Sequence, residues 1–364
     1  MWKYYNPVRV LAGAGVVRQV SEYIPEGLIL LLTTGGFSRR GVTAQIVSDL
    51  GADRVMVCDG VGPNPELDEL EKLTKTLREK KVSAIVALGG GSVLDTAKVL
   101  SLVLADQDAV SLANIFRKGE KHHWTDRLPL VAVPTTAGTG AEVTPFATIW
   151  DSITRKKYSL SSELVTPQFV LLDPELTVTL PHRETLFSGL DAFAHALESL
   201  WNINRNPIST SYSLHALRMA NEALPIVLRE PHSVKMRAKM QQSSLLAGFA
   251  ISQTRTSIAH SISYPLTVHF DMPHGLACGV SLSSILAKLK DGGWSIQKEY
   301  SQLLDHTEQV ITSYPLLEMA KEYCSWTDIE PLIDEMYDPA RADTFIGNVS
   351  SESICSIIKQ SFAD

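Results

Sequence analysis

The sequence predicts two domains of different class: an α/β domain with a mainly parallel sheet over residues 1–180, and an all-helical domain over residues 181–364. In the first half, short continuous apolar runs alternate with amphipathic stretches, which is typical of parallel strands joined by crossover helices. From residue 182 onward the apolar runs disappear and helical patterns follow one another. A length of 364 residues also exceeds what one hydrophobic core usually supports.

The expected strands of the first domain are four apolar runs, at residues 28–33, 54–58, 83–89 and 128–134. These runs are continuous rather than alternating, as expected of strands that are buried on both faces. Between the second and third runs, leucines at steps of 3, 3 and 4 predict one apolar helical stripe, formed by Leu67, Leu70, Leu73 and Leu77. The pattern predicts an open sheet with helices on its faces.

The expected helices of the second domain cover residues 182–201, 208–229, 233–251, 254–264 and 274–290. Pro174 and Pro181 mark the transition, so we set the domain boundary near Leu180 and Pro181. After about residue 290 the sequence stays amphipathic and helical but carries no further motif.

Composition excludes several classes of protein. Apolar residues make up 45% and charged residues 20% of the chain, as in an ordinary globular protein. The net charge of −7 and the lack of a long Lys/Arg block argue against a nucleic-acid partner. We see no signal peptide and no membrane-spanning run, and the four cysteines lack CxxC spacing, so we expect a cytoplasmic protein with reduced thiols.

Two loops that follow strands have the composition of a phosphate-binding site. The first contains Gly89, Gly90, Gly91 and Ser92, and Asp95 and Lys98 follow it on the expected helix. The second, residues 134–144, contains Thr135, Thr136 and Thr139. Backbone N–H groups at a glycine-rich helix start favour an anion, and ligands of open α/β sheets bind at the carboxyl ends of strands. A dinucleotide would fit both loops, although either could be a simple turn.

The stretch from Gly189 to Gly275 contains four side chains that can bind a metal. Asp191 and His195 are four residues apart, so both project from one face of a helix. His260 and His274 add two imidazoles. One carboxylate and three histidines suit a divalent first-row ion such as Fe, Zn, Mn or Co. Cys278 follows His274 by four residues and could face the metal, although packing is the expected role of a buried cysteine.

The motifs GGGSVLDTAK, PTTAGTGAEVT and GLDAFAHALES and the two later histidines occur together and in order. From about residue 5 to about residue 290, the chain resembles the iron-dependent (group III) alcohol dehydrogenases of the dehydroquinate synthase-like fold. The resemblance implies that Asp191, His195, His260 and His274 bind a divalent metal, Fe(II) or alternatively Zn(II). It also implies that a nicotinamide cofactor reduces a small aldehyde to a primary alcohol, or the reverse.

The resemblance further implies a cofactor site in the first domain. Residues 89–92 would hold the pyrophosphate, the three threonines of the second loop would line the site, and Lys157 would lie near the nicotinamide ribose. The segment with Thr34, Gly35, Gly36 and Ser38 is followed by Arg39 and Arg40 and lacks the carboxylate with which many NAD-using members hold the adenosine ribose. Cations there suit a 2′-phosphate, so we expect NADPH, with NADH as the alternative.

Two departures from the family pattern indicate the substrate. Tyr264 stands where the family often has a histidine, and it would either pass a proton to the substrate or wall the pocket. Arg255 stands where relatives have a small or apolar residue, and it would either bind an anion or form a surface salt bridge. With the opening WKYYNPVRV and the string HSISYPLT, these features resemble the phosphonoacetaldehyde reductase branch. We therefore expect phosphonate biosynthesis, with Arg255 as the phosphonate anchor.

Three other interpretations stay open at this stage. The chain could reduce another small aldehyde, act as a dehydroquinate synthase-like lyase that regenerates its cofactor, or bind metal or nucleotide without catalysis. The Asp191/His195 spacing fits the dehydrogenase pattern better than the lyase pattern. We expect a homodimer, the common state of such enzymes, with neither a nucleic-acid nor a membrane partner.

Overall fold

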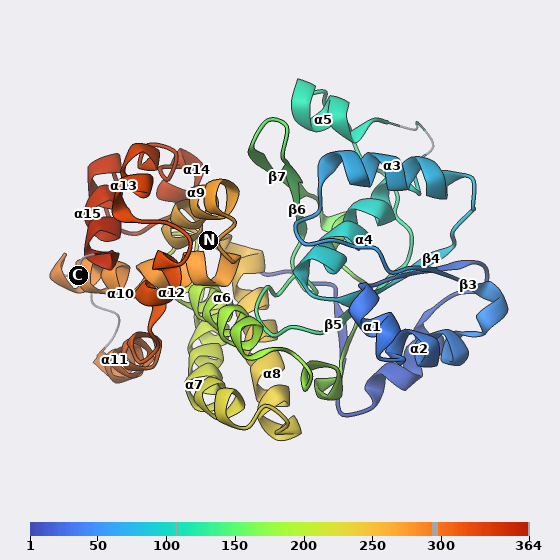
Figure 1. Cartoon of the computed structure of the whole chain (residues 1–364), viewed down its shortest axis with the longest axis horizontal. Helices are drawn as coiled ribbons and strands as arrows, with labels where there is room; N and C mark the ends of the chain where they lie inside the picture. The colour runs from blue at the N-terminus through green and yellow to red at the C-terminus, as the bar shows by residue number, and fades with distance from the viewer. Residues whose placement is uncertain (107, 109, 293–297, 363–364) are drawn as a thin grey trace. The chain divides into compact units, whose positions relative to one another are not determined.

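A computed structural model describes residues 1–106, 108, 110–292 and 298–362 of the chain (Figure 1). The chain forms two compact units. The sheet unit consists of Asn6–Thr136 and Ala141–Thr177, and the helical unit consists of Met1–Tyr5, Ala137–Gly140 and Val178–Asp364. Within the described ranges, we find no helix with the length and apolar character that crossing a membrane requires.

The sheet unit is built on a six-stranded parallel sheet, which confirms the predicted fold class of the first domain. The strand order is β1 (Arg9–Ala12), β8 (Phe169–Leu172), β5 (Leu130–Pro134), β4 (Ala84–Gly89), β2 (Ile29–Leu32), β3 (Val55–Cys58). The four expected strands are present. The prediction missed β1 and β8, which have four residues each and are too short for periodicity to reveal.

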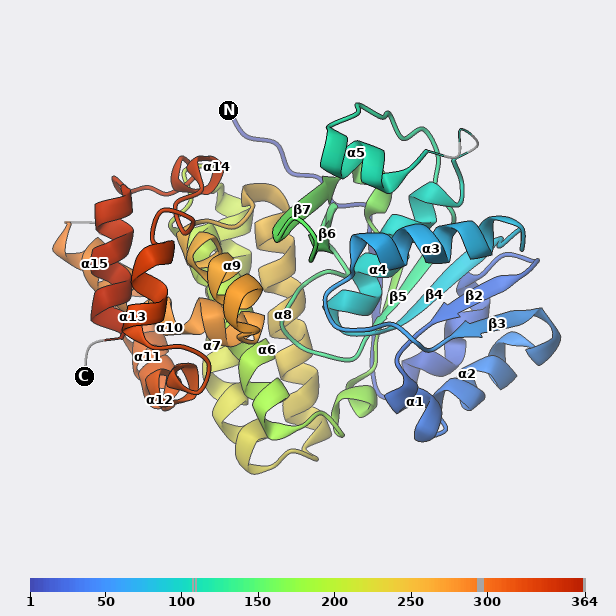
Figure 2. The same cartoon turned by 45° about the horizontal axis from the view of Figure 1, so that its top comes forward.

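Helices cover both faces of this sheet. All four residues of β2 are fully buried, and since successive side chains point to opposite faces, each face needs a cover. Ile29 and Leu31 pack in a cluster that includes residues of η1 (Val16–Tyr23) and α2 (Val42–Leu50). On the opposite face lie α3 (Leu67–Arg78) and α4 (Gly91–Val103) (Figure 2). The predicted leucine stripe lies on α3 with Leu67, Leu70 and Leu77 buried and Leu73 half-buried.

A separate antiparallel hairpin of β6 (Phe146–Asp151) and β7 (Lys156–Ser161) was not predicted. Asp151 of β6 accepts two hydrogen bonds, of 2.8 and 2.9 Å, from Arg117 on α5 (Leu112–Lys118). Burial would raise the pKa of Asp151, but the hydrogen bonds from Arg117 dominate and hold it well below its usual range. The hairpin is therefore joined to α5 by a bidentate ion pair.

The helical unit has no strand within its described residues, as predicted for the second domain. Its first five helices are α6 (His182–Leu200), α7 (Pro207–Arg229), α8 (Val234–Thr254), α9 (Ile258–Phe270) and α10 (His274–Asp291). Further helices follow: α11 (Lys298–Thr312), α12 (Leu316–Lys321), α13 (Trp326–Ile329), α14 (Pro339–Ala342) and α15 (Ser351–Ser361).

The expected helix over residues 254–264 was wrong at its start. Thr254 is the last residue of α8, and α9 begins at Ile258. The break occurs at Arg255, whose backbone has φ 64° and ψ 178°, a combination that is almost confined to glycine. The Arg255 carbonyl accepts a hydrogen bond from the Thr254 hydroxyl at 3.0 Å. Local strain at this residue therefore separates the two helices.

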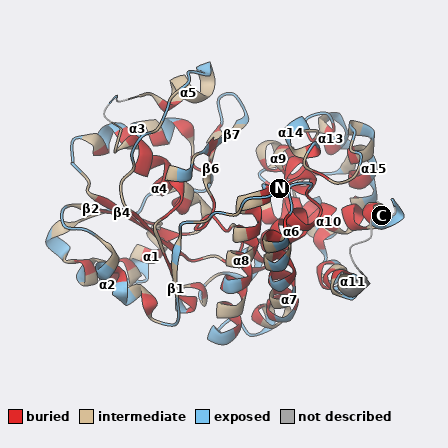
Figure 3. Cartoon of the chain, turned by 180° about the vertical axis from the view of Figure 1, so that it is seen from behind, coloured by how far each residue is buried: buried red, intermediate tan, exposed pale blue. Residues whose placement is uncertain are grey.

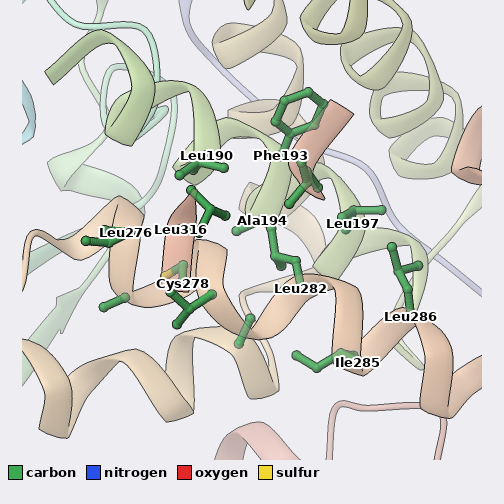
Figure 4. Close-up of a cluster of buried hydrophobic side chains, with 14 of the residues drawn as sticks. Leu190, Phe193, Ala194, Leu197, Leu276, Cys278, Leu282, Ile285, Leu286 and Leu316 are labelled. Carbon is green, nitrogen blue, oxygen red and sulfur yellow. The ribbon is translucent and has the colours of Figure 1, made fainter. Parts of the chain in front are cut away.

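The core of the helical unit lies around α6, most of which is buried (Figure 3). Figure 4 shows the apolar face of α6, with Leu190 and Leu197, against α10, with Leu276 and Cys278. The close packing depends on a glycine, because a Cβ on Gly275 would lie 1.8 Å from the Phe187 carbonyl oxygen of α6. Close approach of α6 and α10 brings the polar face of α6 next to the start of α10.

Candidate metal centre and cofactor loops

Asp191 lies at the centre of the predicted metal site, within the helical unit. Its Oδ1 is 3.6 Å from His195 Nε2, 3.6 Å from His260 Nε2 and 3.9 Å from His274 Nε2. Donors about 2.1 Å from one ion in a tetrahedral arrangement are separated by about 3.4 Å. The three helices α6, α9 and α10 thus bring all four predicted ligands together.

Two atoms of the cluster that could bind a metal have no hydrogen-bond partner among the described residues. They are Asp191 Oδ1 and His260 Nε2, which belong to residues that are each 3% exposed. Leaving such atoms unpaired in a buried site is costly. A bound cation would satisfy both atoms, and borderline nitrogen and oxygen donors suit Fe(II) or Zn(II).

The contacts of the other ring nitrogens orient the three imidazoles. His195 Nδ1 is 3.1 Å from the Gly138 carbonyl oxygen, so it must carry the proton. His260 Nδ1 is 2.7 Å from Glu198 Oε2, and His274 Nδ1 is 3.5 Å from the Ser263 hydroxyl. Each histidine therefore presents Nε2 to Asp191, as metal-bound histidines do when a second partner fixes the ring.

Electrostatics favour a charged Asp191 and a neutral His195. Burial alone would raise the pKa of Asp191, but the imidazoles, His195 foremost, hold it well below its usual range. Burial lowers the pKa of His195, despite the nearby Asp191 carboxylate. A carboxylate and a neutral imidazole are the forms that bind a metal.

The prediction overlooked Glu198, although its spacing signals a role. It follows Asp191 by seven residues and His195 by three, so it lies on the same face of α6. Its side chain is fully buried, and its Oε1 accepts a hydrogen bond of 3.0 Å from the backbone N–H of His260. Its carboxylate thereby positions the start of α9.

Cys278 combines the expected packing role with a position beside the metal cluster. Its thiol is buried among the apolar residues of α10 and α6 (Figure 4), and its Sγ is 3.9 Å from His274 Nε2. One donor atom each from Asp191, His260, His274 and Cys278 lies within 4.8 Å of the others.

Beyond the cluster, Tyr264 borders His274, and the predicted anchor Arg255 lies at the break between α8 and α9. The ring of Tyr264 stacks on His274, with centroids 6.2 Å apart and an interplanar angle of 12°. Arg255 is exposed. The guanidinium of Arg341, which the prediction missed, lies 4.7 Å from the centre of the Tyr264 ring and donates a hydrogen bond to the hydroxyl of Thr256.

In the sheet unit, the two predicted phosphate loops lie side by side because β4 and β5 are neighbours. Gly90 is the N-cap residue of α4, and a Cβ on it would lie 3.1 Å from Thr136 Cγ2. The N–H of Thr135 donates to the Gly89 carbonyl at 3.0 Å, and Ser92 accepts from the Asn64 N–H at 3.1 Å. Gly91 is the first residue of α4.

Three other predicted cofactor residues have different surroundings. Asp95 accepts a hydrogen bond of 2.8 Å from the Thr148 N–H and lies 3.7 Å from Lys98 Nζ, so it already anchors β6. Lys157 of β7 lies with its Nζ 5.2 Å from the centre of the Trp150 ring. Thr139 belongs to the short segment Ala137–Gly140 of the helical unit.

The NADPH segment forms a short helix at the end of β2. Thr34 occupies the N-cap position of α1 (Gly35–Arg39) without a side-chain capping hydrogen bond, and the Ser38 hydroxyl donates to Thr43 Oγ1 at 3.3 Å. Both arginine side chains fold back over the glycines. A Cβ added to Gly35 would lie 3.2 Å from Arg39 Nη1, and a Cβ added to Gly36 would lie 3.3 Å from Arg40 Nη1.

Comparison with known proteins identifies the class to which this fold and site belong. A family model described as iron-containing alcohol dehydrogenase matches residues 7–174. The model for the C-terminal part of the Fe-containing alcohol dehydrogenase family matches residues 185–323. The chain belongs to the iron-containing alcohol dehydrogenase family and is an oxidoreductase, which confirms the predicted resemblance.

Several of the similar proteins are reductases by name. The phosphonoacetaldehyde reductase of Streptomyces viridochromogenes is 39% identical over 223 residues, which are 60% of this chain and 56% of that protein. The sulfoacetaldehyde reductase of Bilophila wadsworthia is 28% identical over 279 residues, 75% of this chain and 71% of that protein. The crystal structure of sulfoacetaldehyde reductase from Bifidobacterium kashiwanohense in complex with NAD+ superimposes with a TM-score of 0.90 at 26% identity, covering 100% of this chain and 99% of that chain.

Proposed function

We propose that this enzyme reduces phosphonoacetaldehyde to 2-hydroxyethylphosphonate with NADPH, at a metal held by Asp191, His195, His260 and His274. The observation that carries the proposal is an arginine close to the metal cluster: Arg341 lies over Tyr264, whose ring stacks on His274. The Tyr264 ring thus lies between the cation of Arg341 and the proposed metal ligand His274. This spacing suits a short substrate with an aldehyde at one end and an anion at the other.

The reduction adds a hydride to the carbonyl carbon and a proton to its oxygen. When bound, the divalent ion supplies a Lewis acid for the carbonyl oxygen and the nicotinamide supplies the hydride. The chain's own residues hold the three Nε2 atoms toward Asp191 and exclude water from that carboxylate. Tyr264 is the proposed hydrogen-bond partner of the substrate oxygen, since its ring borders His274.

The anionic group of the substrate would bind near two arginines, Arg255 and Arg341, which lie far apart in the sequence. Arg255 is exposed at the break between α8 and α9, and the next residue, Thr256, accepts a hydrogen bond from Arg341. The Nε of Arg341 lies 3.3 Å from Asp338 Oδ2, and this carboxylate partly neutralises its charge. A planar guanidinium can bind two phosphonate oxygens at once.

The proposed preference for NADPH is supported by Arg39 and Arg40. Their guanidinium groups fold over Gly35 and Gly36, where the carboxyl end of β2 meets α1. Cations at such a strand end favour the additional 2′-phosphate.

We also propose a homodimer, which sedimentation would test.

The decisive experiment measures initial rates on phosphonoacetaldehyde, sulfoacetaldehyde and propionaldehyde, each with NADPH and with NADH, after loading with Fe(II) or Zn(II). We expect the highest kcat/KM for phosphonoacetaldehyde with NADPH. The variant Arg341→Ala should raise KM for phosphonoacetaldehyde about tenfold or more, since a charge-assisted hydrogen bond contributes about 1.5–3 kcal/mol, and leave KM for propionaldehyde nearly unchanged. Arg255→Ala should act in the same direction.

The matched control is Arg183→Ala, which removes an exposed arginine paired with Glu322 of the same unit. It should leave both KM values unchanged. Equal effects of Arg341→Ala on the charged and uncharged aldehydes would contradict the anchor. A wild-type preference for propionaldehyde would contradict the substrate itself.

A second candidate substrate is sulfoacetaldehyde, since two of the similar proteins are sulfoacetaldehyde reductases and an arginine also binds a sulfonate. The panel separates the two anions directly. Net oxidation of NADPH in the same assay would distinguish a reductase from a dehydroquinate synthase-like lyase, which regenerates its cofactor in each turnover.

A further inference from the structure

We infer that the sulfur of Cys278 is an additional donor to the metal centre, so that the centre has a mixed oxygen, nitrogen and sulfur environment. The inference rests on the metal centre proposed above and concerns a residue that the predicted ligand set does not contain. It depends on three observations, namely the position of the thiol, the unpaired donors around it and the packing that holds it there.

The position of the thiol follows from helical spacing. His274 is the first residue of α10 and Cys278 lies four residues later, so both project from the same face of the helix. Their donors are 3.9 Å apart. With four other donors the ion would be five-coordinate, and a nitrogen about 2.1 Å and a sulfur about 2.3 Å from it would be separated by about 3.1–3.8 Å at the angles of that geometry. The observed distance therefore suits two donors to one ion.

The donors around the thiol point to an ion. Asp191 Oδ1 and His260 Nε2 are buried and lack a hydrogen-bond partner among the described residues. Cys278 is one of the four residues whose donors all lie within 4.8 Å of one another. An ion between these side chains would bind the Asp191 oxygen, the two histidine nitrogens and the Cys278 sulfur at once. Apolar packing around Cys278 would leave the buried oxygen and nitrogen atoms without a partner.

The packing holds the thiol close to the centre. Cys278 is fully buried, and Gly275, one residue after His274, lets α10 approach the backbone of α6. A Cβ added to Gly279, the next residue after Cys278, would lie 2.9 Å from the Leu190 side chain of α6. The two glycines keep α10 close to Asp191, so the sulfur is positioned before any ion binds.

A sulfur donor changes which ions the centre prefers. Thiolates favour Zn(II) and Co(II) over harder ions such as Mn(II), relative to a site with only carboxylate and imidazole donors. We therefore expect the replacement of Cys278 by serine to weaken Zn(II) binding at least about tenfold, the lower limit for the loss of a supporting group at such a site. Binding of Mn(II) should change less.

The test is the spectrum of the full-length protein loaded with Co(II). We expect a near-ultraviolet sulfur-to-cobalt charge-transfer band in the wild type, its loss in Cys278→Ser, and its retention in Cys324→Ser, which alters another buried cysteine of the helical unit. Circular dichroism checks that each variant folds. If Cys278→Ser does not fold, X-ray absorption of the Zn(II)-loaded wild type still decides, because a sulfur donor adds a shell at about 2.3 Å.

Failure of this inference differs from failure of the metal centre. Co(II) that binds without the charge-transfer band, or with a band that survives in Cys278→Ser, would overturn the sulfur donor and leave the centre intact. A protein that takes up no Co(II) at all would overturn both.

Discussion

His260 Nδ1 lies 2.7 Å from Glu198 Oε2, and both side chains are almost completely buried. The same carboxylate accepts the backbone N–H of His260 through its other oxygen, so α6 holds both the ring and the start of α9. A carboxylate beside the outer nitrogen keeps the proton on Nδ1 and leaves Nε2 for a metal. Glu198 is therefore a positioning residue for the proposed centre.

Replacing Glu198 by alanine should weaken metal binding about 10–100-fold, as the loss of a supporting carboxylate usually does. Glu198→Gln should have a smaller effect, because the amide oxygen can still face Nδ1 without its charge. Metal affinity is measured by competition with a chromogenic chelator. The control is Glu222→Gln, which alters an exposed carboxylate paired with Lys239, and equal affinities in all four proteins would refute the role.

Introducing a carboxylate at the end of β2 should reverse the cofactor preference. Thr34 is the N-cap of α1, where aspartate is also a favourable residue, so Thr34→Asp should fold normally. Its charge would repel a 2′-phosphate and accept hydrogen bonds from a ribose. We expect kcat/KM with NADPH to fall and that with NADH to rise. An unchanged ratio would argue that this segment does not contact the adenosine ribose.

Adding a methyl group at Gly275 should disrupt the metal centre from the backbone side. The new Cβ would lie 1.8 Å from the Phe187 carbonyl oxygen, so α10 would have to move away from α6 and carry His274 with it. We expect Gly275→Ala to lose about 3 kcal/mol of folding free energy and to bind metal more weakly. Gly62→Ala is the control, since its Cβ would meet no atom within 4 Å, and a similar melting temperature for both variants would be inconsistent with this packing.

The stability of the sheet unit should fall as the pH rises toward neutrality. Burial raises the pKa of Glu142 from 4.5 to about 7, so between these values the folded state binds more protons than the unfolded state. The contribution of Glu142 to the free energy of unfolding is therefore complete below pH 4.5. It is lost as the pH rises through about 7, and the loss amounts to about 3 kcal/mol. Glu142→Gln should not show this loss, and its advantage over the wild type should grow with pH.

Denaturant unfolding at a series of pH values measures this difference. The control is Glu79→Gln, because Glu79 is exposed. Parallel pH profiles of the wild type and Glu142→Gln would show that folding does not change the pKa of this carboxyl group.

Several features of this protein follow from sequence alone because they depend on local periodicity. Continuous apolar runs identified all four of β2, β3, β4 and β5, although only β2, β4 and β5 are buried on both faces. The edge strand β3 is partly exposed, because only the tertiary structure decides which strand ends the sheet. The spacing of Asp191 and His195 on one helix predicted half of the metal cluster. Glu198 lies on that same helical face, so the sequence contained the signal for it as well.

Tertiary structure decided what local pattern cannot encode. The break at Arg255 depends on a strained backbone that the rest of the unit stabilises. Arg341 reaches Tyr264 from a helix 77 residues further along the chain, and Cys278 reaches Asp191 only because Gly275 lets two helices approach closely. Periodicity determines which face of a helix is apolar or polar, whereas the packing of distant helices determines which of those faces meet.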